Sequence, residues 1–215
     1  MPYNEKLVIL ADGNYSVSNF VHAYQNKLRY FGDLRNQLVH GFRLENKHYV
    51  LASDYAVEEI EKVYEELRKP TSVSQAFGRE VYTCTLDDVL REVIIVMRQE
   101  LNTHVPVYDK KGNFVEMLSE STIAYRIADQ IGDDGEIHLA DIKVGDVSLK
   151  NTNDEFVFVE ASKSIYDIEQ LFAQTLQAKK RLGAAFVTKT GSSDEVITGI
   201  VTAMDLPRLA DHFVL

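Results

Sequence analysis

An internal repeat occupies the last two-thirds of the chain and limits the folds open to it. The stretch "VYTCTLDDVLREVIIVM" resembles "FVFVEASKSIYDIEQLFAQ", and each has a β-rich run, a polar turn and an amphipathic helical pattern. Further on, "THVPVYDKKGNFVEMLSESTIAYRIA" resembles "GAAFVTKTGSSDEVITGIVTAMDLPRLA", each with a strand, a Gly-containing turn, a second strand and a helix start. Each copy is therefore predicted to be β-α-β-β-α. One copy cannot bury both faces of so small a sheet, so the two are expected to pack together.

The segment before the repeat is predicted to be helical. Apolar residues recur at helical intervals in "YSVSNFVHAYQNKLRYFGDLRNQLVH", and Gly41 follows as a stop signal. A second helix fits "SDYAVEEIEKVYEELRK", capped by Ser53 or Asp54. Its predicted buried stripe consists of Val57, Ile60, Tyr64 and Leu67.

The stretch "KPTSVS" around Pro70 is typical of a linker, so we place a domain boundary there. The expected fold class is α+β, with a helical segment at residues 1–70 and the repeat at 72–215. The first copy is expected at about 72–130 and the second at about 138–215. The two copies are expected to form a pair related by a pseudo-two-fold axis.

Charge and composition narrow the function classes. The net charge is −10, of which residues 71–215 carry −9, so the chain lacks the basic face of most nucleic-acid-binding proteins. It also lacks an apolar stretch of the roughly 20 residues that a membrane helix needs. A single cysteine, Cys84, cannot form an internal disulfide and fits a reducing cytoplasm. In the sequence as a whole, the residues that commonly bind metals do not occur at the spacing of a metal-ligand cluster.

Near the C-terminus, "ITGIVTAMDL" places Thr202 and Asp205 three residues apart where a strand gives way to a helix. One interpretation is a helix cap, in which the two side chains satisfy backbone groups. The other is a ligand site, because a carboxylate can accept hydrogen bonds from both hydroxyls of a ribose diol. Both interpretations can hold at once, and the duplicated context favours the ligand.

Residues 72–215 resemble a CBS domain pair, or Bateman module. The resemblance lies in "THVPVYDKKGNFVEMLSEST", "AAFVTKTGSSDEVITGIVTAMDL" and the lead-in "ADIKVGDV". It implies that Asp205 holds a ribose and that Thr202 meets ribose or phosphate. The implied walls of the base pocket include Phe158, Val159, Ala185 and Phe186, each of which is also an ordinary core residue type.

The first copy departs from this pattern. Ser119 fits the hydroxyl position, but Glu116 stands in place of the glycine and Thr122 in place of the aspartate. A threonine does not accept both ribose hydroxyls as well as a carboxylate does. The resemblance therefore implies one good site per chain, in the second copy.

The implied ligand is an adenine nucleotide, AMP, ADP or ATP, although S-adenosylmethionine and cyclic dinucleotides share the adenosine group. Candidate phosphate partners are Lys143, Arg126 and Arg208. The implied protein is a cytoplasmic regulatory ligand sensor that forms a homodimer and passes its state to the helical segment or to a regulated protein partner.

A second resemblance lies in "DLRNQLVHG", which is similar to the motif of HEPN domains. Many HEPN proteins are metal-independent ribonucleases that act as symmetric dimers. Carried over, Arg35 would stabilise a phosphate, His40 would move a proton and Asn36 would orient His40. The structural alternative is that Arg35 and Asn36 make local hydrogen bonds and that His40 favours a helix C-terminus.

Three hypotheses therefore remain open from the sequence. The leading one is a nucleotide-sensing regulatory module without enzymatic activity. The second is a ribonuclease gated by the CBS pair. The third is a scaffold that binds no ligand.

Overall fold

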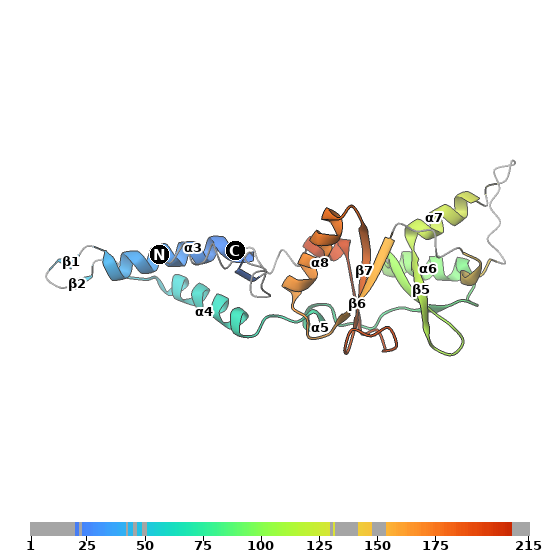
Figure 1. The fold of residues 1–215 in the computed structure, drawn as a ribbon, viewed down its shortest axis with the longest axis horizontal. Coiled ribbons are helices and arrows are strands. Elements are labelled where there is room, and N and C mark those ends of the chain that lie inside the picture. The colour runs from blue at the N-terminus through green and yellow to red at the C-terminus, as the bar shows by residue number, and fades with distance from the viewer. Residues whose placement is uncertain are drawn as a thin grey trace. The chain divides into compact units, whose positions relative to one another are not determined.

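The computed structural model describes residues 20–21, 23–41, 43–44, 47–48, 51–129, 131, 142–147 and 154–207 (Figure 1). These residues fall into two compact units. One holds the described residues up to Thr71 together with Ser164–Gln170, and the other holds the described parts of Ser72–Lys163 and Leu171–Pro207. Among the described residues, no helix is both long enough and apolar enough to cross a membrane.

The first unit is built on two helices that lie side by side, α3 (Gln25–His40) and α4 (Asp54–Arg68) (Figure 1). A short antiparallel pair, β1 (Arg43–Leu44) and β2 (Lys47–His48), lies between them in sequence. Gly41 follows α3 as expected, with its N–H bonded to the Gln37 carbonyl. Ser53 caps α4, because its hydroxyl accepts the Ala56 N–H at 3.2 Å.

The predicted buried stripe of α4 is wrong. Val57, Ile60, Tyr64 and Leu67 are 41–56% exposed. The helix instead turns Glu59 and Val63 inward, and Glu59 is held there by Lys27 of α3 at 3.1 Å. The first unit is completed by the start of α8 (Ile165–Gln177), whose buried Tyr166 donates a hydrogen bond to Glu66 at 2.9 Å.

The second unit contains both copies of the repeat, except for the start of α8, which belongs to the first unit. The first copy consists of β3 (Cys84–Thr85), α6 (Leu90–Glu100), β4 (His104–Tyr108), β5 (Phe114–Ser119) and α7 (Glu120–Asp129). The second consists of β6 (Asp154–Glu160), α8, β7 (Arg181–Thr188), β8 (Gly199–Thr202) and the 3₁₀ turn η3 (Ala203–Asp205). In each sheet the first strand is parallel to the middle one and the last is antiparallel to it. The predicted α+β class is confirmed, and the first copy has the predicted β-α-β-β-α order. The second copy has the same order up to β8 and η3, and the rest of its predicted final helix lies outside the described residues.

Two short elements complete the second unit. The helix α5 (Val73–Phe77) precedes the first copy, and the 3₁₀ turn η1 (Val144–Asp146) precedes the second. Both hairpins turn through a glycine, Gly112 and Gly191, with φ of +81° and +84°. Side chains other than glycine rarely adopt this backbone conformation, which explains the glycine in both predicted turns.

An aromatic cluster joins the two sheets. The ring of Phe114 in the first copy lies 5.3 Å from Phe156, 5.0 Å from Phe158 and 5.7 Å from Phe186 of the second, in edge-to-face arrangements. Such contacts add to the free energy gained by burying the rings. The two copies therefore pack against each other, as the size of their sheets predicts.

Candidate functional site

The end of β8 carries the two residues that the sequence singles out. The backbone N–H and the hydroxyl of Thr202 both donate to one oxygen of Asp205, at 2.9 and 3.0 Å. Thr202 is buried and Asp205 is partly exposed. The capping interpretation is therefore confirmed.

A glycine allows another segment to run beside this strand. Gly199, the first residue of β8, faces Gly78 in an antiparallel bridge, and the Arg79 N–H donates to the Thr198 carbonyl at 3.0 Å. A Cβ atom on Gly199 would lie 2.7 Å from the carbonyl oxygen of Phe77. The segment that leads into the first copy can thus form a wall against the second copy.

A small cleft opens between this lead-in segment and β8. It has a volume of about 160 Å³. Its lining consists of the lead-in residues 79–82, of Glu100, Asn102 and His104 from the first copy, and of Ile200 from β8. Ile200 precedes Thr202 by two residues in the same strand, so both side chains project from the same face of the sheet. The face that carries Thr202 therefore borders the cleft at Ile200, but neither Thr202 nor Asp205 is among the residues that line it.

The predicted pocket walls lie on two faces of the second sheet. Phe158 pairs with Phe186, and both belong to the cluster between the sheets, as does Ile200. Val159 and Ala185 are buried and alternate with these residues along their strands, so they project to the opposite face. The structure thus brings Phe158 and Phe186 onto the Thr202 face and leaves Val159 and Ala185 behind it.

The corresponding site of the first copy consists of hydroxyl groups. The Ser119 hydroxyl lies 2.8 Å from that of Ser121 and 3.0 Å from that of Thr122, and it accepts the Thr122 N–H at 3.2 Å. Ser119 and Thr122 are both buried. These groups satisfy one another and begin a regular helix, α7.

The candidate phosphate partners differ in their surroundings. Lys143 pairs with Asp87 at 3.2 Å, and this lysine and Lys110 lower the pKa of the Asp87 carboxyl through their hydrogen bonds. Arg126 is partly buried on α7, and Arg208 lies outside the described residues. Arg181 begins β7. Ala184, three residues later, pairs with Thr202, so Arg181 lies toward the η3 end of the strand.

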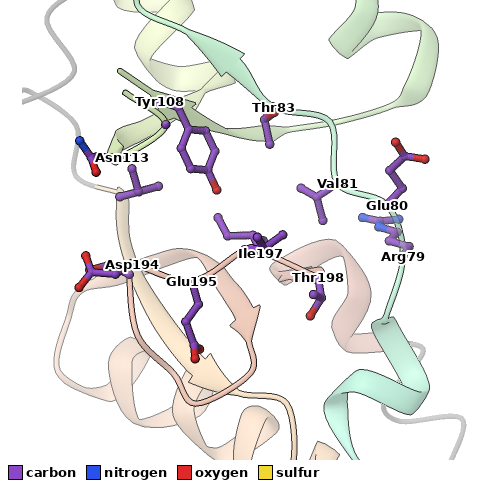
Figure 2. A pocket seen from close by; sticks show the side chains of 14 residues that line it. Arg79, Glu80, Val81, Thr83, Tyr108, Asn113, Asp194, Glu195, Ile197 and Thr198 are labelled. Atoms are coloured by element: carbon purple, nitrogen blue, oxygen red, sulfur yellow. The ribbon is translucent and has the colours of Figure 1, made fainter. Parts of the chain in front are cut away.

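A larger cavity of about 660 Å³ lies at the hairpin turns (Figure 2). It is lined by the lead-in residues 79–81 and 83 and by parts of both turns, and the Tyr108 hydroxyl points toward Val81 and Ile197. Burial raises the pKa of Tyr108. The acidic Glu80, Asp194 and Glu195 outnumber Arg79 around it, so its charge does not suit a phosphate. Sequence reasoning missed this cavity, because turn residues give no periodic signal for side-chain direction.

The HEPN-like residues meet on one surface of α3. The Arg35 guanidinium donates to the Asn36 side-chain oxygen at 3.2 Å and lies 3.4 Å from the Nε2 atom of His40. Arg35 and His40 are exposed. Within the part of the chain that the structure describes, no group of three or more His, Cys, Asp or Glu side chains is arranged to hold a metal.

Comparison with known proteins gives a family for the first copy. The model of the CBS domain family matches residues 73–129. A search of curated proteins found no match.

Several solved structures are similar at low identity. One is a signal-transduction protein with CBS domains from Burkholderia ambifaria, which is 19% identical over 64% of this chain and 92% of that one, with a TM-score of 0.48. Another is the CBS domain of a membrane protein from Sphaerobacter thermophilus, at 19% identity over 72% and 97%, with a TM-score of 0.48. A third is the CBS domain of a bacterial CNNM/CorC family Mg²⁺ transporter in complex with ATP, at 17% identity over 72% and 97%, with a TM-score of 0.46.

Proposed function

We propose that this chain is a regulatory module built on a CBS domain pair, and that it binds an adenosine-containing ligand where the second copy ends in Thr202 and Asp205. The HEPN-like resemblance of the N-terminal segment stays a prediction. In this proposal, the CBS pair senses the ligand, and the helical unit dimerises or contacts a regulated protein partner.

The observation that carries the proposal is the carboxylate of Asp205 at the end of β8. Thr202 fixes it through two hydrogen bonds to one oxygen, so it is oriented before a ligand arrives. A ribose diol supplies two adjacent donors that such a carboxylate can accept. Charge assistance makes these hydrogen bonds stronger than those between neutral groups.

The surroundings supply partners for the other parts of an adenine nucleotide. Val81 and Ile200 offer an apolar wall for the base, and Arg181 supplies a cation toward η3 for a phosphate. The small cleft has a volume of about 160 Å³. This is below the roughly 300–1,000 Å³ of typical ligand pockets. The nucleotide must therefore extend from the cleft along β8 toward Asp205.

The test is a thermal-shift and calorimetric titration of the full chain with AMP, ADP, ATP and S-adenosylmethionine. A ligand at about 100 times its Kd should add roughly 2.7 kcal/mol to the free energy of unfolding. Asp205→Ala should abolish this shift. If no ligand shifts the wild type, or if the variant responds as fully, the proposal is wrong.

The chain offers a matched control for the lost cap. At the start of α8, the Ser164 N–H and hydroxyl donate to one oxygen of Asp167 at 3.2 and 2.8 Å, with the same spacing of three residues. Asp167→Ala therefore removes a similar cap outside the candidate site. It should lower stability about as much as Asp205→Ala does, but it should leave the ligand-induced shift intact.

A second candidate function is supported by the contact between Arg35 and His40. A guanidinium beside an imidazole on an exposed helix offers a phosphate partner and a proton carrier together. The test is RNA cleavage in the presence of a metal chelator. His40→Ala should abolish cleavage, whereas Arg29→Ala, an exposed site on the same helix, should not. Absence of cleavage by the wild type would dismiss this function.

A further inference from the structure

Helix α4 departs from the usual arrangement of a surface helix, because it exposes an apolar stripe and buries a carboxylate beside Val63. A helix on the surface of a globular protein normally turns its apolar stripe to the core and its charges to water. In α4 the stripe formed by Val57, Ile60, Tyr64 and Leu67 is exposed, and Glu59 is buried. We call this set of four residues the α4 stripe.

The inward face of α4 is held by polar contacts within the first unit. Glu59 accepts from Lys27 of α3 at 3.1 Å and from Lys62 at 2.7 Å, and these lysines lower its pKa. Glu66 accepts the Tyr166 hydroxyl at 2.9 Å and the Thr71 N–H at 2.7 Å. A rotation of α4 that buried its stripe would break these contacts. The carboxylates of Glu59 and Glu66 would then lose their ion-pair and hydrogen-bond partners. Among the described residues of the unit, these contacts therefore keep the stripe exposed.

The stripe has the spacing of a helix-pairing seam. Its members follow at intervals of three, four and three residues, which is the a/d pattern of antiparallel and parallel coiled coils. Two helices that meet along such a seam bury both stripes from water. Contiguous exposed apolar surface of this kind is typical of protein–protein contact sites.

The charges along one edge of the stripe indicate what covers it. Asp54, Glu61 and Arg68 are spaced by seven residues, so they line the same edge of the seam, in the order acidic, acidic, basic. In an antiparallel pair of identical α4 helices, Asp54 of each copy faces Arg68 of the other. Arg68 lies 3.5 Å from Glu65 of its own helix, and both side chains are exposed, so Arg68 can exchange this partner for Asp54. The helix dipoles also oppose each other in this arrangement, which is favourable. The edge is thus complementary to a second copy of itself in the antiparallel direction.

We propose that the α4 stripe is the surface on which two copies of this chain associate, with the two α4 helices antiparallel. In this pair Val57 packs against Leu67 of the other copy, and Ile60 packs against its Tyr64. Each contact occurs twice, as two-fold symmetry requires. The inference rests on the dimerising part of the proposed function and does not depend on ligand binding at Asp205.

Glu61 is the one member of the edge that does not fit its partner. At the centre of an antiparallel pair it faces the same residue of the other copy, and like charges in such positions repel. The proposal therefore also predicts a change that strengthens dimerisation, because neutralising Glu61 removes this repulsion.

The experiment is sedimentation velocity of the full chain without ligand, over a series of concentrations. The wild type should dimerise, and Ile60→Glu should weaken dimerisation by more than about tenfold in Kd, because it places a charge in each half of the seam. Tyr55→Glu is the matched control, because Tyr55 is an exposed aromatic residue of the same helix outside the stripe. It should leave the Kd unchanged, and circular dichroism should verify that both variants keep their helices.

Charge reversal tests the antiparallel direction. Asp54→Arg and Arg68→Glu should each weaken association, and the double variant should restore it, since each chain then carries both reversed charges. Glu61→Gln should strengthen it. A monomeric wild type, undiminished dimerisation of Ile60→Glu, or no restoration in the double variant would each overturn the proposal. Loss of ligand binding alone would leave it standing, so the two proposals fail separately.

Discussion

The two copies of the repeat share a topology but end their last strands with different chemistry. In the first copy, Ser119 and Thr122 form a buried cluster of hydroxyls that satisfy one another. In the second copy, Thr202 donates twice to the carboxylate of Asp205, which stays partly exposed. The same fold thus makes one closed strand end and one strand end that presents a charge. The two strand ends differ in the residue that follows the hydroxyl by three positions. It is a buried threonine, Thr122, in the first copy and a partly exposed aspartate, Asp205, in the second.

The copies also differ at the position where the last strand meets the lead-in segment. Gly199 lies so close to Phe77 that no side chain fits, whereas the first copy has Glu116, whose carboxylate accepts the Met117 N–H at 3.1 Å. The close approach is therefore needed in only one copy. It builds the wall of the small cleft beside β8.

Filling this contact should have the largest effect. Gly199→Val would place a branched side chain against the Phe77 carbonyl, and overpacking of this kind costs about 3 kcal/mol. Glu116→Val is the matched change in the first copy and should alter stability by about 0.5 kcal/mol or less. Urea denaturation of the full chain measures both. Equal effects would mean that the close approach does not distinguish the copies.

The sequence predicted the repeat well, because strand and helix periods and the Thr202–Asp205 spacing are local patterns. It failed on α4, because periodicity identifies an apolar face but not the neighbour that covers it. Glu59 and Glu66 are turned inward by Lys27 and Tyr166, which lie 32 and 100 residues away in the chain. No local pattern contains that information.

The sequence likewise predicted only part of the candidate site, namely the motif residues at the two strand ends. The hydroxyl and carboxylate of the second copy, and the hydroxyls of the first, lie where the pattern places them. The pocket walls depend on strand alternation, which sends Phe158 and Val159 to opposite faces. The cavity at the turns depends on how two distant hairpins meet, and turn sequences do not specify that.

Giving the first copy the chemistry of the second should be the next most costly change. Thr122 is only 3% exposed, so Thr122→Asp would bury a carboxylate among hydroxyls, at a cost of about 2 kcal/mol. Burial raises the pKa of such a carboxyl, so the cost should be present at neutral pH and should shrink as the pH falls. Denaturation across a pH series measures it. An unchanged stability at neutral pH would mean that water or a ligand reaches this position.

The reverse exchange should cost less. Asp205→Thr removes the acceptor of the Thr202 N–H and hydroxyl, and loss of such a cap costs about 1 kcal/mol. The smaller cost follows from the partial exposure of Asp205, since water can replace the lost partner. The variant should also lose the adenosine-dependent shift. A variant that keeps both its stability and its ligand response would show that the two strand ends are equivalent.

The smallest difference between the copies concerns Cys84. By the register of the sheets, Cys84 pairs with Val107 as Val159 pairs with Val187, so Cys84→Val makes the two copies alike at this position. The change should cost about 0.5 kcal/mol at neutral pH, because a buried thiol packs as a small apolar group.

Burial raises the pKa of the Cys84 thiol from 9.0 to about 12. Folding thus opposes its ionisation, so the wild type should lose stability relative to Cys84→Val as the pH rises from about 9 toward 12. Denaturation at rising pH, with thiol labelling of the folded chain at neutral pH, measures both effects. Rapid labelling of the folded chain, or parallel pH curves for the two proteins, would contradict the burial of Cys84.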